Sequence, residues 1–197
     1  MANGEFNHRL SDYIVVVRGI ISKEMCQQVI DLYKDNPKWD WALTTGGLNL
    51  DTRKVKQVRI SDPAVLQQGS QYEKMDAEIF KVMSKAKDMY IQTLTEKRGI
   101  KHLPEINSDE GYQLLHYAEG YYFKEHCDHG SGMTRVLTCT LNISDDHDGG
   151  LFRFLRGEFD VRLNAGDAVL FPSNFMFPHE VTEITRGERH SIVTWFC

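Results

Sequence analysis

The sequence has few cysteines and prolines, no long apolar run and no excess of positive charge. Its four cysteines form no CxxC pair, so the sequence predicts free thiols in a reducing compartment rather than a disulfide framework. The apolar run Tyr13–Val17 is closed by Arg18 and is much shorter than a signal-peptide core or the roughly 20 residues of a membrane helix. We therefore expect a soluble, cytoplasmic protein that is not associated with a membrane.

The formal net charge of −5 argues against nucleic acid or an anionic membrane as the main partner. A chain of 197 residues is long enough for one domain with a substantial core and too short for two comfortable ones. The sequence contains no internal repeat, low-complexity tract or linker. We therefore expect one domain over residues 1–197, and the sequence gives no indication of its oligomeric state.

The first half of the chain predicts helices that support a core, over residues of about 20–100. Ser22 is typical of an N-cap, and apolar residues follow it at helical spacing as far as Asn36-Pro37. A longer helix is predicted from about Gln71 to Arg98, with Gly99 as its stop. Its methionine-rich stripe is typical of a core face.

The segment between the two helices, Lys38–Gly69, has an irregular pattern in which only Val55–Ile60 indicates a strand. A long irregular segment in a compact domain is uncommon unless it is functional or disordered. It carries Trp39 and Trp41, for which two interpretations stay open: they line a substrate groove, or they cover the side of the core.

The pattern changes after Glu110. Short β-branched and aromatic runs alternate with turn signals such as Gly149-Gly150, Gly166-Asp167 and Arg186-Gly187, and no helical period lies between them. Many short strands at regular spacing indicate a β-sandwich or barrel. The fold class is therefore α+β, mainly β.

The triplet His126-Cys127-Asp128 indicates a metal site. In an extended strand, His126 and Asp128 point to one face while Cys127 faces away. A distant imidazole, for which His179 is the candidate, completes two histidines and one carboxylate. That set leaves positions open and suits non-haem Fe(II) working with O₂. The alternatives are ordinary surface polar residues or a structural zinc site, although structural zinc sites usually have four protein ligands.

An ordered series of motifs surrounds this triplet. Tyr-x-x-Gly precedes His-x-Asp, a strand with Arg and Thr follows, and Gly-Gly, Gly-Asp, a distal His and a basic residue ten positions later complete the series. The residues are Tyr117 and Gly120, His126 and Asp128, Arg135 and Thr138, Gly149-Gly150, Gly166-Asp167, His179 and Arg189. The series resembles the 2-oxoglutarate- and Fe(II)-dependent dioxygenases, most of all their prolyl-4-hydroxylase-like branch.

The resemblance implies a double-stranded β-helix (jelly roll) with supporting N-terminal helices, the jelly-roll core lying at about 111–197. It implies Fe(II), 2-oxoglutarate as co-substrate and O₂, with ascorbate as an additional reductant. The implied reaction hydroxylates an unactivated C–H bond while 2-oxoglutarate is converted to succinate and CO₂. Halogenases of this family lack the carboxylate ligand, so the presence of Asp128 favours hydroxylation.

The resemblance also implies co-substrate residues. Arg189 is the candidate for the distal carboxylate of 2-oxoglutarate, because a guanidinium group matches a carboxylate with two hydrogen bonds. The alternative is a surface arginine paired with Glu183 or Glu188. Tyr117 would add its hydroxyl, unless it is an ordinary core tyrosine, and Asn142 would add a polar contact.

Two further residues, Arg135 and Trp195, are candidates for the mouth of the site, near the substrate, although either can equally be structural. Among the other histidines, His129 and His190 are predicted to point away from the site by strand alternation. His147 lies in an acidic turn, and we expect it to be exposed to solvent.

The leading prediction for the substrate is a prolyl residue in a peptide or protein, with a free amino acid or another small molecule as the alternative. A nucleic-acid demethylase of the same superfamily is disfavoured by the acidic charge balance. A non-catalytic metal-binding jelly roll is disfavoured because Asp128 and Arg189 are both retained. A purely structural β-sandwich leaves the spacing of the motifs unexplained.

Overall fold

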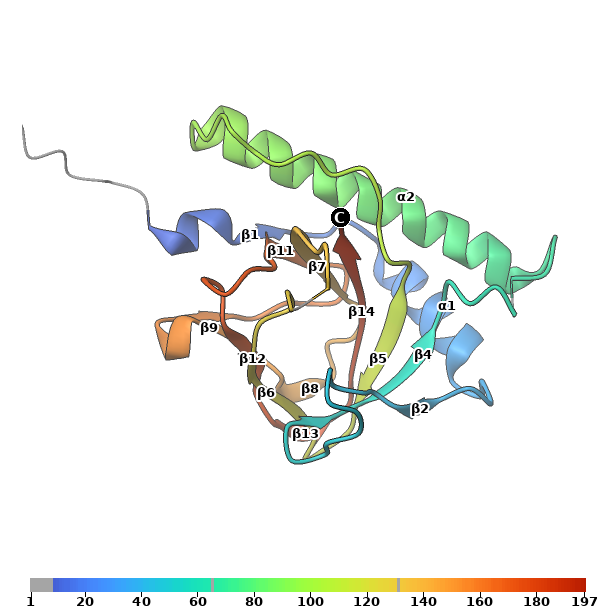
Figure 1. Ribbon diagram of the computed structural model, residues 1–197. Coiled ribbons are helices and arrows are strands. Elements are labelled where there is room, and N and C mark those ends of the chain that lie inside the picture. The colour runs from blue at the N-terminus through green and yellow to red at the C-terminus, as the bar shows by residue number, and fades with distance from the viewer. Residues whose placement is uncertain (1–8, 65, 131) are drawn as a thin grey trace, which may run out of the picture.

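The computed structural model describes residues 9–64, 66–130 and 132–197. Two antiparallel sheets face each other, and two helices cover the outer face of the larger sheet (Figure 1). A third, two-stranded sheet pairs β8 (His147–Gly149) with β13 (Ile184–Gly187). The architecture is the predicted mainly-β jelly roll with supporting helices.

The larger sheet has seven strands. In spatial order they are β1 (Val15–Val17), β11 (Ala168–Pro172), β7 (Leu137–Asn142), β14 (Arg189–Phe196), β5 (Gln113–Tyr117), β4 (Lys56–Arg59) and β2 (Asp40–Trp41). The smaller sheet has five strands, in the order β10 (Phe159–Val161), β9 (Phe152–Phe154), β12 (His179–Val181), β6 (Tyr122–His126) and β3 (Arg53–Lys54). Short 3₁₀ turns, Leu10–Tyr13 and Leu155–Gly157, precede β1 and β10.

Helix α1 (Lys23–Tyr33) begins as predicted at Ser22, whose hydroxyl accepts a hydrogen bond from the Met25 amide. Its buried residues, Cys26, Val29 and Tyr33, recur at intervals of three and four and so form one face. That face packs on the larger sheet. The helix ends shortly before the predicted stop.

Helix α2 (Gln71–Gln92) lies along the larger sheet, on the side away from β6, β9 and β12 (Figure 1). The helical path continues as one π turn over Thr93–Lys97, so the predicted end near Arg98 is correct for the path but not for the α-helix itself. Met83 is fully buried in the core, whereas Met89 is exposed. The methionine stripe is therefore only in part a core face.

Strand alternation divides the interior into two cores. Leu114 on β5 and Ile192 on β14 face the helices, while Leu115 and Val193 face the smaller sheet. The residues between the sheets include many aromatic side chains, and the candidate site lies among them. Within the described residues, no helix is both long and apolar enough to cross a membrane.

Candidate metal and co-substrate site

The two predicted histidine ligands lie directly opposite each other on adjacent strands of the smaller sheet. The register of β6 and β12 pairs His126 with His179, and their rings lie 4.3 Å apart between centroids. Nδ1 of His126 lies 2.8 Å from the Lys124 carbonyl, and Nδ1 of His179 lies 3.1 Å from the Phe177 carbonyl. Because a carbonyl only accepts, each Nδ1 carries a proton, and in a neutral ring Nε2 then keeps the lone pair.

Both lone pairs face the carboxylate of Asp128. Oδ1 lies 3.5 Å from Nε2 of His126, and Oδ2 lies 3.6 Å from Nε2 of His179. Strand β6 ends at His126, so Asp128 lies in a bend, and strand alternation alone does not explain its direction. Its position is fixed by the Thr138 hydroxyl, which donates to Oδ2 at 2.6 Å, and by the Arg135 guanidinium, which donates to its carbonyl at 3.1 Å.

The protonation states favour a cation between these three side chains. Burial lowers the pKa of His179 to about 4, so that imidazole is neutral at physiological pH. Burial alone would raise the pKa of Asp128, but His179, His126 and the Thr138 hydroxyl together hold it below its usual value. One ligand atom from each residue lies within 4.8 Å of the others. Two imidazoles and one carboxylate form the open set that suits Fe(II).

Arg189 points into the space between the sheets and is only 1% exposed. Its guanidinium lies 5.2 Å from the ring centres of both Tyr117 and Phe152, and Nη1 donates weakly to the Ser191 hydroxyl at 3.3 Å. Nη2 has no hydrogen-bond partner among the described residues. The alternative of a surface arginine paired with a glutamate is therefore wrong. A buried cation with unused donors fits an anionic ligand.

The Gly-Gly motif makes room for this arginine. A Cβ atom on Gly150 would lie 2.8 Å from Cδ of Arg189 and 2.7 Å from Cδ1 of Ile184. The φ angle of Gly150 is +65°, which disfavours residues with a side chain. Gly150 therefore allows the backbone to pass close to the Arg189 side chain.

The three candidate ligands and Arg189 line one space between the two sheets, which we call the inner cavity. Its lining also includes side chains from both sheets: Arg53, Leu115, Tyr117, Phe123, Thr138, Thr140, Phe152, Val181, Ser191, Val193 and Trp195. A second depression, which we call the outer groove, shares five residues with the inner cavity: Arg53, Phe123, His126, Asp128 and Trp195. The outer groove is otherwise lined by Leu43, Thr44, Thr45, Thr52, Gln57, Gln113, Cys127, His129, Gly130, Met133 and Arg135. The candidate metal position therefore lies between the two.

Of the remaining predicted residues, Tyr117, Arg135 and Trp195 line the inner cavity or the outer groove, whereas Asn142 lines neither. Tyr117 is buried beside Arg189, and burial raises the pKa of its hydroxyl, which stays protonated. Asn142 does not line the inner cavity, and its amide donates to the carbonyls of Ser144 and Leu163. Arg135 stacks on Trp195 at 3.7 Å and pairs with both carboxylate oxygens of Glu110, and it borders the outer groove.

Sequence reasoning missed Arg53. It lies on β3, is buried, and lines both the inner cavity and the outer groove. Its guanidinium stacks on Phe123 at 4.7 Å and donates to the Leu43 carbonyl at 2.7 Å, while Nε has no partner among the described residues. No signal in the sequence identifies it, because it lies in the irregular segment before the predicted strand.

The expectation for His147 was wrong. It lies on β8 and is only 4% exposed, with burial and the nearby Arg189 lowering its pKa. The acidic residues around it point to solvent while the imidazole is turned inward. His129 is exposed, but it lies beyond the end of β6 and borders the outer groove, so strand alternation does not determine its direction. Trp39 packs on the helix-side core, so for this residue the interpretation as a cover of the core is correct. Neither Trp39 nor Trp41 lines the outer groove.

Comparison with known proteins agrees with this geometry. Residues 112–197 match the 2OG-Fe(II) oxygenase superfamily. The chain is 37% identical over 91 residues to a PKHD-type hydroxylase of Caulobacter vibrioides, a match that covers 40% of this chain and 39% of that protein. It is 43% identical over 67 residues to one of Acinetobacter baylyi, covering 32% of this chain and 29% of the relative. The chain thus spans about two fifths or less of the curated relatives that it matches.

Solved structures of prolyl hydroxylases share the fold over nearly the whole chain. One is a prolyl hydroxylase from Trichoplax adhaerens in complex with a hypoxia inducible factor peptide fragment, with a TM-score of 0.71 and 17% identity over 94% of this chain and 84% of that one. Another is a prolyl-4-hydroxylase from Pseudomonas putida, with a TM-score of 0.68 and 19% identity over 93% of this chain and 92% of that one. Residues 112–197 of the chain are therefore similar to the 2OG-Fe(II) oxygenase superfamily, and the chain as a whole shares the fold of these solved prolyl hydroxylases.

Proposed function

We propose that the protein is an Fe(II)- and 2-oxoglutarate-dependent dioxygenase that hydroxylates a prolyl residue in a peptide or protein. One observation carries the proposal: a histidine–histidine–carboxylate cluster and a buried arginine, which has no carboxylate partner among the described residues, line the same cavity. The arginine keeps one buried donor without a partner in that part of the chain, which destabilises a fold without a ligand. Together they match a metal and an anion held side by side.

His126, Asp128 and His179 would hold Fe(II). The carbonyls of Lys124 and Phe177 fix the two imidazole rings, and Thr138 fixes the carboxylate, so the ligand atoms are oriented before the metal binds. Bound there with 2-oxoglutarate and O₂, Fe(II) supplies the oxidation of a C–H bond to an alcohol. The part of this chain is to orient the reactants and to exclude water.

Arg189 would bind the distal carboxylate of 2-oxoglutarate with its unused donors. The Tyr117 hydroxyl is available as a second donor, because burial keeps it protonated. The aromatic and aliphatic side chains around the inner cavity, such as Phe152, Val181 and Leu115, exclude water from the methylene groups. The low polarity there strengthens the pairing between guanidinium and carboxylate.

The substrate would lie in the outer groove, where the reacting C–H bond can approach the metal. Arg135 and Trp195 form a stacked pair at its wall, and the Glu110 carboxylate holds the guanidinium in place. Arg53 is a further candidate for contact with the substrate backbone, because its Nε has no partner in the part of the chain that the structure describes. A prolyl substrate is supported by the prolyl hydroxylases that share the fold and by the peptide in the Trichoplax adhaerens structure.

The setting of the enzyme is proposed on separate grounds. All four cysteines are free thiols, which supports a reducing, cytoplasmic compartment. The helices share one continuous core with the larger sheet, which supports a single domain over the chain.

A turnover assay tests the proposal. The protein would be incubated with Fe(II), 2-oxoglutarate, ascorbate and proline-containing peptides, and succinate and a mass increase of one oxygen atom in the peptide would be measured. We expect the two products in equal amounts, and neither from His126→Ala. Succinate release that no peptide stimulates would contradict a peptide substrate. No succinate from iron-loaded protein would contradict the dioxygenase itself.

A further inference from the structure

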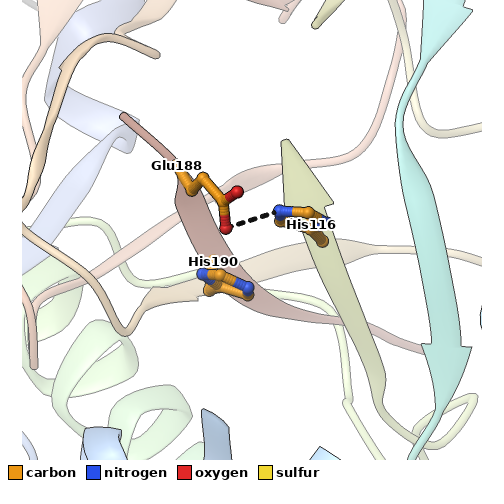
Figure 2. Close-up of side chains that lie close together, drawn as sticks. All are labelled: His116, Glu188 and His190. Atoms are coloured by element: carbon orange, nitrogen blue, oxygen red, sulfur yellow. Dashed lines mark hydrogen bonds and ion pairs between the residues drawn. The ribbon is translucent and has the colours of Figure 1, made fainter. Parts of the chain in front are cut away.

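A second cluster of metal-binding side chains lies on the opposite face of the larger sheet. It contains His116 on β5, His190 on β14 and Glu188, which lies just before β14 (Figure 2). One ligand atom from each residue lies within 4.8 Å of the others, as in the candidate iron site. These two clusters are the only ones of this kind among the described residues.

The register of the strands creates this cluster. β14 and β5 are antiparallel, and His190 lies directly opposite His116. The next pair in the register is Arg189 with Tyr117, which points into the inner cavity. Because alternate residues face opposite sides, the histidine pair lies back to back with the proposed co-substrate pair. Glu188 is two residues before His190 and therefore shares its face.

The distances suit a bound cation. Nε2 of His116 lies 3.0 Å from Oε2 of Glu188, a hydrogen bond in this structure, and this distance is also close to the roughly 3 Å that separates two ligand atoms bound to one first-row ion (Figure 2). The rings of His116 and His190 are stacked, with centroids 4.6 Å apart and planes at 12° (Figure 2). Two imidazolium cations would repel each other in this arrangement, so at least one ring has a free lone pair.

His190 has unused ligand capacity. Its backbone amide donates to the Ser144 hydroxyl at 2.7 Å, but its ring nitrogens have no hydrogen-bond partner among the described residues. The side-chain torsion that rotates the ring is soft, so the lone pair can turn toward the atoms of His116 and Glu188. Trp39 packs edge-on against the His116 ring, with centroids 6.0 Å apart, and forms one wall of the site.

The site is also accessible. The side chain of Glu188 is 61% exposed and that of His116 is 22% exposed, so an ion can enter from solvent and keep water ligands. Lys56 is the register partner of His116 on β4, and its ammonium lies over the Trp41 ring at 5.7 Å. It is therefore directed toward the aromatic ring rather than toward the site.

We propose that His116, Glu188 and His190 form a second site for a divalent transition-metal ion such as Zn²⁺. Two imidazoles and one carboxylate match the ligand preferences of zinc and its neighbours, with water completing the coordination. The ion would link β5 to β14, the two strands that carry Tyr117 and Arg189. The proposal does not depend on the proposed dioxygenase activity.

Zn²⁺ binding to His116, Glu188 and His190 can be measured in a variant that lacks the candidate iron site. In an untagged His126→Ala/His179→Ala background, Zn²⁺ binding would be followed by calorimetry and by competition with a chromophoric chelator. We expect one equivalent of Zn²⁺ to bind. We expect His116→Gln or His190→Gln to weaken this binding by at least about tenfold, and Glu188→Gln to weaken it less. His102→Gln, on an exposed histidine away from the cluster, is the matched control and should bind as the background does.

Cu²⁺ provides a second readout. Its electron paramagnetic resonance spectrum should show coupling to two imidazole nitrogens in the background protein and to fewer in His190→Gln. Circular dichroism and thermal melting would establish that each variant is folded. If a histidine variant does not fold, Glu188→Gln, which changes an exposed side chain, still tests the site. Failure of the background protein to bind Zn²⁺, or binding that persists unchanged in the folded cluster variants, would overturn the proposal.

Discussion

Replacement of Arg189 by methionine should have opposite effects on stability and on co-substrate binding. The guanidinium is buried, and among the described residues Nη2 has no partner and no carboxylate pairs with the charge. An unsatisfied buried polar group costs about 1–3 kcal/mol, and a buried charge without a partner costs more. Methionine has a similar length without the charge. We therefore expect the free energy of unfolding of the co-substrate-free protein to rise by about 1 kcal/mol.

Binding of 2-oxoglutarate should weaken in the same variant. Arg189 can offer two charge-assisted hydrogen bonds, and removing one partner leaves a carboxylate desolvated and unpaired. A loss of about 3 kcal/mol corresponds to an affinity lower by roughly two orders of magnitude. Affinity for Fe(II) should not change, because the three proposed ligands keep their own hydrogen bonds.

Chemical denaturation of the metal-free protein measures the first effect, and anaerobic calorimetry with Fe(II) and 2-oxoglutarate measures the second. Arg186→Met is the matched control, since that arginine is exposed and pairs with surface aspartates. It should leave both quantities within experimental error. If Arg189→Met destabilised the protein and kept full affinity for 2-oxoglutarate, the assignment of a buried anion receptor would be refuted.

Three further predictions concern the surroundings of the site. Gly150→Ala should displace the Arg189 side chain and raise the KM for 2-oxoglutarate by about tenfold or more. Gly157→Ala is the control, because Gly157 also has a positive φ but its added Cβ would make only an ordinary contact. This variant should have the same kind of backbone strain and an unchanged KM. Steady-state kinetics of the two folded variants measure the difference, and equal KM values would contradict the packing argument. Thr138→Val should lower Fe(II) affinity by about 10–100-fold, because the Asp128 carboxylate loses a hydrogen bond of 2.6 Å. A chelator competition assay measures the affinity, and an unchanged value would refute the role of Thr138. The metal-free protein should lose stability as the pH falls from about 6.5 to about 4, because the pKa of His179 is lowered to about 4 and the unfolded chain binds the proton first. The free energy of unfolding, measured from denaturation curves, should therefore depend on pH less steeply in His179→Gln, by up to about 1.4 kcal/mol per pH unit. Identical slopes in the two proteins would contradict a buried neutral imidazole.

Local sequence pattern predicted most of the fold. The N-cap at Ser22, the apolar spacing of α2 and the short strands after Glu110 are local signals, and the elements lie where those signals put them. Boundaries were less accurate. Strand β1 covers only Val15–Val17 of the apolar run Tyr13–Val17, because Tyr13 ends a 3₁₀ turn.

The candidate site could be predicted in outline because its residues lie in ordered motifs. His179 and Arg189 lie ten residues apart in the sequence, and both line the inner cavity. The strands that carry them, β12 and β14, belong to different sheets. The arginine therefore faces the histidines across the inner cavity. Such a relation depends on how two sheets pack, which no local pattern encodes.

Other features depend on tertiary packing alone. Arg53 reaches the site because β3 pairs with the distant β6. His147 is buried because β8 pairs with β13, although its sequence neighbours are acidic. The cluster of His116, Glu188 and His190 exists only in the register of β5 and β14. In each case, the residue type at one position carries no information about the strand that lies beside it.

An anaerobic visible spectrum, recorded while the metal-free protein is titrated with Fe(II) and then with 2-oxoglutarate, tests the central claim most directly. A keto acid that chelates Fe(II) at His126, Asp128 and His179 should produce a weak charge-transfer band. The band should be absent in Asp128→Ala and should need much more 2-oxoglutarate in Arg189→Met. Iron binding without any band on addition of 2-oxoglutarate would contradict the claim that the metal and the buried arginine serve one co-substrate.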